Sequence, residues 1–420
     1  MYHRTVLDNG IRIISEKVPH LKSVSLGIWV NTGSRDETRP ENGVSHFIEH
    51  MSFKGTHHRD VHQIAKELDV IGGLSNAFTG KENTCFHGRV LGRHFDHLAD
   101  ILSDIFLNST FNRVELERER EVILQEINMI QDTPDDNLHM LFTELFWQGH
   151  PIGWPVLGTG ETVSAITKET ILNYIRKSYV PDEILVAAAG DVDHSHMISF
   201  FEPLFDPIPG AGRRRPARTA PVSRGGLAIH YKPLEQVHIC LGGEAPSQVD
   251  ENRFSCAVLN AILGGNMSSR LFQEVREKRG LAYSIYSFLS IYMDAGLLGI
   301  YAATEPKHLN LVLKTIRKEV LKLCRGELTE PELAAAKEHL IGGIYLGSES
   351  ADNRMMRMAK NEFAFGRYVD YEELVSSLEQ VSRDAVVAMA RRTFQGGKLS
   401  FAGLGPLTEG AVDRGLLEYD

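Results

Sequence analysis

The chain has 420 residues, of which 42% are apolar and 24% are charged, proportions typical of a globular protein with a sizeable core. This length predicts two domains, and the net charge of −10 argues against nucleic acid as the main partner. No stretch approaches 18 consecutive apolar residues and the N-terminus lacks a leader-like segment, so we expect a soluble, cytoplasmic protein without a membrane span. The four cysteines form no CxxC pair, which indicates reduced thiols: Cys85, Cys240, Cys256 and Cys324.

Hydrophobic periodicity and turn residues predict alternating strands and helices in the first half. Residues 4–15 alternate around Asp8–Gly10, the pattern of a hairpin, and a strand follows at 24–30. A helix then contains residues 46–50 and ends near Gly55. The further expected elements are a helix at 58–68, paired strands at 76–79 and 84–91, helices at 95–106, 112–129 and 161–179, and a buried strand at 184–189. This succession predicts an α+β domain, an antiparallel-rich sheet with helices packed on one side.

A break in the pattern separates this half of the chain from a second one. Residues 207–226 are rich in proline and glycine and poor in apolar residues, as is typical of an interdomain linker. Its arginine triplet, Arg213–Arg215, is interpreted as a solvated run of charge, with a patch for an anionic ligand as the alternative. The linker divides the chain into domains at 1–206 and 227–420.

The second half repeats the first at a nearly constant spacing. Glu115 falls on Glu332, and residues 166–190 fall on residues 381–405. Two matched stretches in the same order indicate a duplicated domain of about 200 residues. The copies differ in chemistry, because only the first contains a His-x-x-Glu-His motif.

That motif is His46-Phe-Ile-Glu-His50, the inverted-zincin arrangement. On a helix, His46 and His50 lie one turn apart on the same face, so both imidazoles can bind one metal ion. Glu49 then lies beside the metal without being a ligand, and a zinc hydrolase needs such a base next to a zinc-bound water. The alternative is a solvated or partly buried helix with two ordinary histidines.

A zinc site of this kind needs a third protein ligand, and the helix at 112–129 is the expected source. Glu119 and Glu126 are seven residues apart and share a helix face that is otherwise apolar. Spacing alone does not choose Glu126, and a solvated acidic face is the alternative interpretation of this segment.

The stretch from His46 to Thr56 closely resembles the signature of the pitrilysin/insulysin family, especially its processing-peptidase β-type members. The resemblance extends over essentially the whole chain. It implies that Glu126 is the third zinc ligand and that Glu119 supports catalysis. A segment similar to the family's substrate-binding strand, which would bind an extended peptide through main-chain hydrogen bonds, comprises Asn76, Ala77, Phe78 and Thr79.

The second half carries a further likeness to this family. Residues 264–283 resemble its second-half signature, in which an arginine and a tyrosine seven residues apart approach the substrate at the metal. Arg276 and Tyr283 match that spacing, which implies that Tyr283 donates to the developing oxyanion and that Arg276 binds peptide carbonyls or stabilises charge. The chain departs from many members at Phe86, where they have a tyrosine, so any role of that hydroxyl is absent.

The resemblance implies a clamshell that encloses a chamber, with one Zn²⁺ per chain held by His46, His50 and Glu126 and with Glu49 as general base. Because the chain resembles half of the larger single-chain members, we expect a homodimer, or a heterodimer with a related subunit, in which Tyr283 of one chain serves the zinc site of the other. The predicted function is zinc endopeptidase activity on peptides or unfolded segments. The alternatives are a non-catalytic assembly subunit of the same family and a peptide-binding module with structural zinc.

Overall fold

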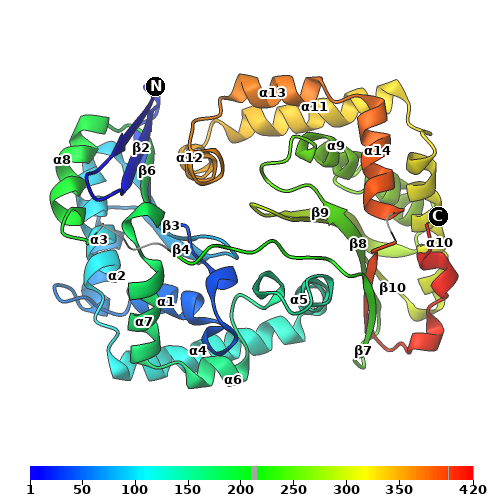
Figure 1. Ribbon diagram of the computed structural model, residues 1–420, viewed down its shortest axis with the longest axis horizontal. Coiled ribbons are helices and arrows are strands. Elements are labelled where there is room, and N and C mark those ends of the chain that lie inside the picture. The colour runs from blue at the N-terminus through cyan, green and yellow to red at the C-terminus, as the bar shows by residue number, and fades with distance from the viewer. Residues whose placement is uncertain (210–214, 396, 420) are drawn as a thin grey trace. The chain divides into compact units, whose positions relative to one another are not determined.

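The computed structural model describes residues 1–209, 215–395 and 397–419, which form two compact units (Figure 1). The first unit comprises Met1–Met129, Trp154–Thr219 and Leu346–Val369. The second comprises Ile130–Gly153, Ala220–Tyr345 and Asp370–Asp420. Neither unit is a continuous stretch, because each takes one helix from the opposite half of the chain.

The sheet of the first unit has six strands in the order β1-β2-β6-β3-β5-β4. All neighbours pair antiparallel except β2 and β6, which run parallel. The strands are β1 (Tyr2–Val6), β2 (Arg12–Lys17), β3 (Ser23–Val30), β4 (Leu74–Thr79), β5 (Thr84–Leu91) and β6 (Ile184–Gly190). The hairpin predicted at 4–15 is therefore present as β1 and β2, and β4 lies at an edge of the sheet.

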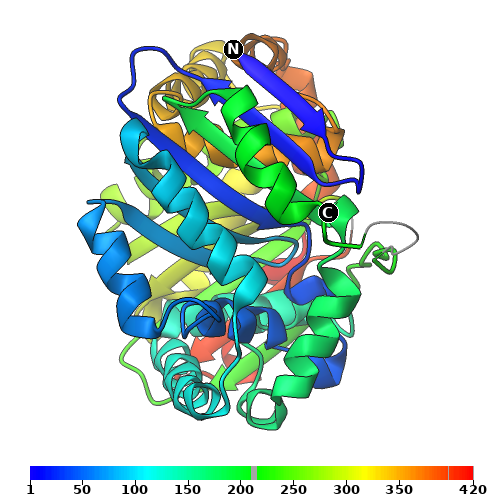
Figure 2. The ribbon, with the colours of Figure 1, turned by 90° about the vertical axis from the view of Figure 1, so that its left-hand side faces the viewer.

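Helices α3 and α8 pack on one face of this sheet (Figure 2). The apolar core on that face includes Leu26, Phe86 and Leu102, none more than 1% exposed. The helices encoded in the first half and belonging to this unit are α1 (Val44–Ser52), α2 (Val61–Val70), α3 (Phe95–Asn108), α4 (Arg113–Asp132, up to Met129), α6 (Gly160–Ala165), α7 (Lys168–Ser178) and α8 (His194–Phe205). The single helix expected at 161–179 is divided into α6 and α7, because the side chain of Thr167 accepts a hydrogen bond from Thr170 N and begins a new helix.

The opposite face of the sheet is covered by α12 (Ala351–Phe365), which the second half of the chain contributes. Met355 of this helix is fully buried, and the Nε1 of Trp29 donates a hydrogen bond to its sulfur at 3.3 Å. Glu362 near the end of the helix accepts from the guanidinium of Arg4 at 3.1 Å. Apolar packing and ion pairs together attach α12 to a sheet that lies more than 150 residues away in the sequence.

The sheet of the second unit has five strands in the order β7-β11-β8-β10-β9. Its one parallel pair is β7 and β11, and the other neighbours are antiparallel. The strands are β7 (Gly226–Tyr231), β8 (Val237–Ala245), β9 (Ala282–Ile291), β10 (Gly296–Thr304) and β11 (Ser400–Gly405). This order matches β2-β6-β3-β5-β4 of the first unit strand for strand, including the parallel pair, as a duplicated domain predicts.

Helices also cover both faces of the second sheet. One face carries helices from the second half of the chain: α9 (Arg253–Leu263), α10 (Leu309–Cys324), α11 (Glu330–Gly347), α13 (Tyr371–Glu379) and α14 (Arg383–Phe394). The other face packs against α5 (Pro134–Phe146), whose Phe142 and Phe146 are fully buried against the strands. The first half therefore contributes α5 to the second unit, as the second half contributes α12 to the first.

The predicted α+β fold with two homologous domains is confirmed. The exchange of α5 and α12 was not predicted, and it places a helix on the sheet face that was expected to lack one. The boundaries at residues 206 and 227 separate the duplicated halves of the chain and remain a prediction. The compact units are divided differently, because α5 belongs to the second unit and α12 to the first. Among the helices in the described part of the chain, none is long and apolar enough to cross a membrane.

Candidate active site

Helix α1 holds the His-x-x-Glu-His motif, and its N-terminus is capped from outside the helix. Both oxygens of the Glu37 carboxylate accept from backbone N–H groups at this end, one from Gly43 at 2.8 Å and the other from Ser45 at 2.9 Å. Burial raises the pKa of Glu37 to about 7, although these hydrogen bonds partly offset that rise. Glu37 thus satisfies N–H groups that a helix start otherwise leaves unpaired, directly before His46.

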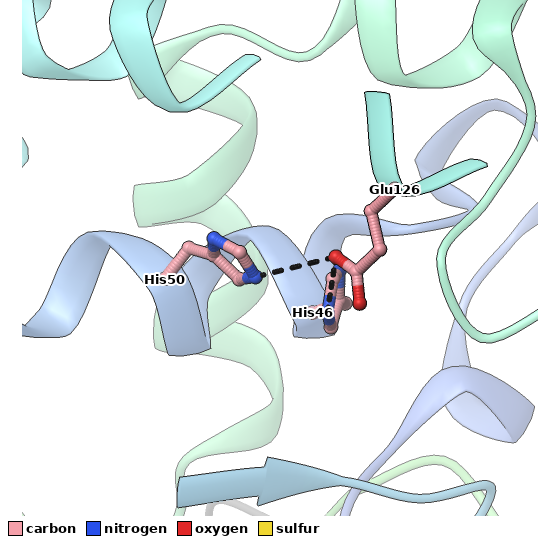
Figure 3. Close-up of side chains that lie close together, drawn as sticks. All are labelled: His46, His50 and Glu126. Atoms are coloured by element: carbon pink, nitrogen blue, oxygen red, sulfur yellow. Dashed lines mark ion pairs between the residues drawn. The ribbon is translucent and has the colours of Figure 1, made fainter. Parts of the chain in front are cut away.

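His46, His50 and Glu126 converge on one point (Figure 3). The Oε2 of Glu126 on α4 lies 3.6 Å from the Nε2 of His46 and 3.6 Å from the Nε2 of His50. Ligands bound at the usual zinc distances to one tetrahedral ion lie about 3.4 Å apart, so this spacing leaves room for a metal between them. Burial, together with the nearby His50, lowers the pKa of His46 to about 3 and keeps its imidazole neutral, the form that binds a metal. The three donors therefore fit a zinc ion.

Glu119 lies on the far side of His50. Its Oε2 is 3.1 Å from the Nδ1 of His50, and its Oε1 forms an ion pair with Lys54 at 2.8 Å. The residue is only 6% exposed. A carboxylate on the second nitrogen of a ligating histidine fixes the ring and its tautomer. The seven-residue spacing on α4 thus gives two carboxylates that face different atoms of one imidazole.

The carboxyl of Glu49 on α1 interacts electrostatically with His50 and Glu126, and its role as a base remains a prediction. Burial raises the pKa of the Glu49 carboxyl, while a hydrogen bond with Thr79 and the charge of His50 act in the opposite direction. Its Oε2 is buried and has no hydrogen-bond partner in the described part of the chain. Within the described residues, this oxygen can therefore accept a hydrogen bond from a further group.

The predicted substrate segment, Asn76–Thr79, lies in β4, which among the described strands pairs only with β5. Thr79 at its end touches α1, since its hydroxyl donates to the carbonyl oxygen of Ser45 at 3.4 Å. Strand β4 therefore ends next to the motif helix. Phe86 on β5 points into the apolar core beside Phe106, so the missing hydroxyl is a difference on the buried face of the sheet.

Arg276 and Tyr283 belong to the second unit. The guanidinium of Arg276, in the π-helical turn Phe272–Glu277, lies over the ring of Tyr283 at 4.5 Å. Tyr283, on β9, is 78% exposed, which leaves its hydroxyl available to a ligand. The structure thus brings the predicted arginine and tyrosine together, and their approach to the histidines remains a prediction.

Comparison with known proteins places the chain in a family. The family described as "Insulinase (Peptidase family M16)" matches residues 12–160, and "Peptidase M16 inactive domain" matches residues 165–340. The chain belongs to peptidase family M16. A relative from Bacillus subtilis named "Uncharacterized zinc protease YmxG" is 39% identical over 94% of this chain and 96% of its own length. Another from Streptomyces coelicolor, "Uncharacterized zinc protease SCO5738", is 38% identical over 98% of this chain and 91% of its own length.

Two solved structures share the fold of this chain. A Pseudomonas fluorescens structure, described as a peptidase M16 inactive domain, has a TM-score of 0.89 at 20% identity over 97% of this chain and 98% of that one. A protease from Helicobacter pylori has a TM-score of 0.88 at 21% identity over 96% of this chain and 99% of that one. These two structures support the fold, and the family predicted from the sequence is confirmed by the two family matches and the relatives at 38–39% identity.

Two residues that support this M16 site were missed from the sequence. Glu37 lies seven residues before the first residue of α1, and no local pattern connects it with the helix that it caps. Lys54 follows His50 by four residues, a spacing that would place it near the same helix face. The four-residue spacing could therefore have predicted Lys54 as a supporting residue, because a lysine there can reach the carboxylate of Glu119 beside His50.

Proposed function

We propose that this M16 chain is a zinc-dependent endopeptidase that hydrolyses peptides or unfolded segments bound in extended form within a closed chamber. The observation that carries the proposal is the position of the Glu126 carboxylate oxygen, 3.6 Å from the Nε2 atoms of both histidines. In this proposal His46, His50 and Glu126 hold one Zn²⁺ per chain. Zinc so bound supplies Lewis acidity and lowers the pKa of a water ligand.

The protein's own residues supply the remaining chemistry. Glu49, with one buried oxygen that lacks a partner in the described residues, takes the proton of the attacking water and passes it to the leaving amine. The free edge of β4 aligns the peptide by main-chain hydrogen bonds, which gives affinity with little sequence preference. Arg276 and Tyr283 are proposed to stabilise the carbonyl oxygen as negative charge develops.

The names of the two relatives include zinc, which supports the choice of metal for this chain. The alternative is a non-catalytic subunit of the same family, in line with the "inactive domain" description of the second half. A homodimer, or a heterodimer with a related subunit, remains part of the proposal.

The deciding experiment compares wild type with Glu49→Gln and with Glu121→Gln, the same change at an exposed position of α4. Hydrolysis of quenched-fluorescent peptides and zinc content are measured on the same samples. We expect Glu49→Gln to retain zinc and to lose at least about two orders of magnitude in rate, the range of a general base, while Glu121→Gln matches wild type. Wild-type turnover by zinc-loaded Glu49→Gln would refute the assignment of the base. A zinc-loaded wild type that hydrolyses no peptide would favour the non-catalytic alternative.

A further inference from the structure

The middle of the interdomain linker is anchored in the first unit by a largely buried cluster of charges. Arg218 donates from Nε and Nη2 to the two oxygens of Asp36, at 2.9 and 2.7 Å. Arg215 donates to Oδ1 of the same carboxylate at 2.5 Å. The side chains of all three are at most 11% exposed. We call Asp36, Arg215 and Arg218 the linker clasp.

The clasp corrects the interpretation of the arginine triplet as solvated charge, which is wrong for Arg215. Arg213 and Arg214 lie outside the described residues. The side chain of Arg215 is only 11% exposed because its partner Asp36 lies in the turn after β3, 179 residues earlier in the chain. Composition shows a linker rich in charge and turn residues, but it does not show a partner so far away in the sequence.

The charges of the clasp are stable in their buried surroundings. Burial alone would raise the pKa of Asp36, but the hydrogen bond and charge of Arg218, with the charge of Arg215, lower it overall. Burial likewise acts against the charge of Arg218, yet Asp36 keeps the pKa of the guanidinium above its ordinary value. A bidentate arginine–carboxylate pair holds its two partners in one geometry. The clasp is therefore suited to fixing positions rather than to adding stability, since buried ion pairs are weak stabilisers.

The clasp also contacts the turn between β4 and β5. Arg218 Nη2 donates to the carbonyl oxygen of Glu82 at 2.7 Å, and Arg35 Nη1 donates to the Glu82 carboxylate at 2.6 Å. The backbone N–H of Ser34 donates to the carbonyl oxygen of Gly80 at 3.1 Å. The turn between β4 and β5 is thus bound by both the linker and the segment that holds Asp36.

A second route leads from Asp36 to the motif helix. Asp36 accepts from the backbone N–H of Gly33 at 3.1 Å, and the carbonyl of Gly33 accepts from the hydroxyl of Tyr174 at 3.2 Å. That hydroxyl in turn accepts from the side chain of Ser45 at 2.9 Å. Ser45 directly precedes His46. The series of contacts from Asp36 through Arg218 to the turn has fewer steps than this one. It ends at β4, the strand expected to bind substrate.

We propose that Arg218, supported by Arg215, is a positioning residue for peptide binding, because it fixes the turn after β4 and thereby the free edge of that strand. The inference rests on the proposed function only in that β4 binds the peptide backbone. The linker thus does more than connect two domains: Arg215 and Arg218, near its middle, complete the peptide-binding surface of the first unit. Loss of Arg218 therefore weakens peptide binding. It leaves zinc binding unchanged, because Arg218 contacts neither the donor cluster nor Glu49.

The test measures peptide affinity separately from turnover. The dissociation constant of a fluorescein-labelled extended peptide is determined by anisotropy in the zinc-loaded Glu49→Gln background, which prevents cleavage. Arg218→Ala, Arg218→Lys and Asp36→Asn are compared with Arg224→Ala, an exposed arginine of the same linker. Zinc content and Tm are recorded for each variant, and kcat and KM are measured without the Glu49 change.

We expect Arg218→Ala to raise Kd and KM on the order of tenfold, the effect of one or two weakened main-chain hydrogen bonds. Zinc content should not change, and kcat should stay within about a factor of three. Arg218→Lys should fall between wild type and alanine, because an ammonium cannot bind both carboxylate oxygens in a fork. Combining Arg218→Ala with Asp36→Asn should add little to either change, since the two residues act as one unit. Arg224→Ala should leave Kd unchanged.

An unchanged Kd in Arg218→Ala, even with a lower Tm, would overturn the inference by showing that the clasp is only structural. Should the alanine variant fail to fold, an unchanged Kd in Arg218→Lys would overturn it equally. Loss of zinc or of kcat at constant Kd would also overturn it. If wild type binds the peptide but never cleaves it, the proposed function fails alone, and the inference is still decided by Kd. Absence of any peptide binding would overturn the inference.

Discussion

Three glutamates of α4 allow the proposed zinc site to be tested with one chemical change. Glu126 faces the Nε2 atoms of both histidines, Glu119 faces the Nδ1 of His50, and Glu121 is exposed. Replacing each in turn by glutamine keeps the size of the side chain and removes its charge. We expect the loss of zinc affinity to follow the order Glu126→Gln, then Glu119→Gln, with Glu121→Gln equal to wild type.

The magnitudes follow from the contacts. Glu126→Gln exchanges an anionic ligand for a neutral amide, so zinc affinity should fall by more than about a hundredfold. In Glu119→Gln a single oxygen must serve two donors, the Nδ1 of His50 and the Nζ of Lys54, which now bind different oxygens. The ring of His50 is then held less firmly. Loss of such a supporting carboxylate costs about 10- to 100-fold, or about 1.4–2.7 kcal/mol, and we expect the lower end.

His46 differs from His50 in having no supporting carboxylate among the described residues, so the effect of Glu119→Gln on zinc affinity can be assigned to His50. The Nδ1 of His46 is buried without a hydrogen-bond partner in the described part of the chain, so Glu119 is the one carboxylate seen to orient a histidine of the cluster. Zinc affinity is measured by competition with a chromophoric chelator, and bound zinc by ICP mass spectrometry. Equal loss in Glu119→Gln and Glu126→Gln, or the reverse order, would refute the division into ligand and supporting residue. A wild-type zinc affinity in Glu126→Gln would refute the site itself.

Three further outcomes are expected. Met355→Ala should lower the free energy of unfolding by about 2–5 kcal/mol in denaturant titration, because it leaves a cavity and an unpaired Trp29 N–H under α12; a change below 1 kcal/mol would contradict that packing. Asp36→Asn should lower the free energy of unfolding by about 3–5 kcal/mol at pH 7. Because the folded-state pKa of Asp36 is lowered, its stabilisation is present above pH ~4 and lost as the pH falls through that pKa. Calorimetry should therefore find the stabilities of wild type and variant converging in acid, and parallel curves would contradict this. Mixing inactive Glu49→Gln with inactive Tyr283→Phe under subunit exchange should restore about a quarter of wild-type activity if sites are shared in a two-fold dimer. No recovery, with exchange confirmed by native mass spectrometry, would exclude shared sites.

Local patterns in the sequence were enough for the motif and much of the first sheet. Two histidines four residues apart must share a helix face, so the pairing of His46 and His50 needs no tertiary information. The same holds for the common face of Glu119 and Glu126, and for the β1–β2 hairpin. Choosing Glu126 as the ligand required the family resemblance, because helical spacing treats both carboxylates alike.

The tertiary structure decided what depends on partners far away in the chain. An amphipathic helix does not encode which sheet covers its apolar face, so the exchange of α5 and α12 between the units was not predictable from periodicity. Burial of Arg215 was missed for the same reason, since only the fold brings Asp36 to it. The folded chain also assigned atoms to the carboxylates: Glu126 turns to the Nε2 atoms and Glu119 to the Nδ1 of His50. That assignment depends on how α4 lies against α1, and neither helix specifies it alone.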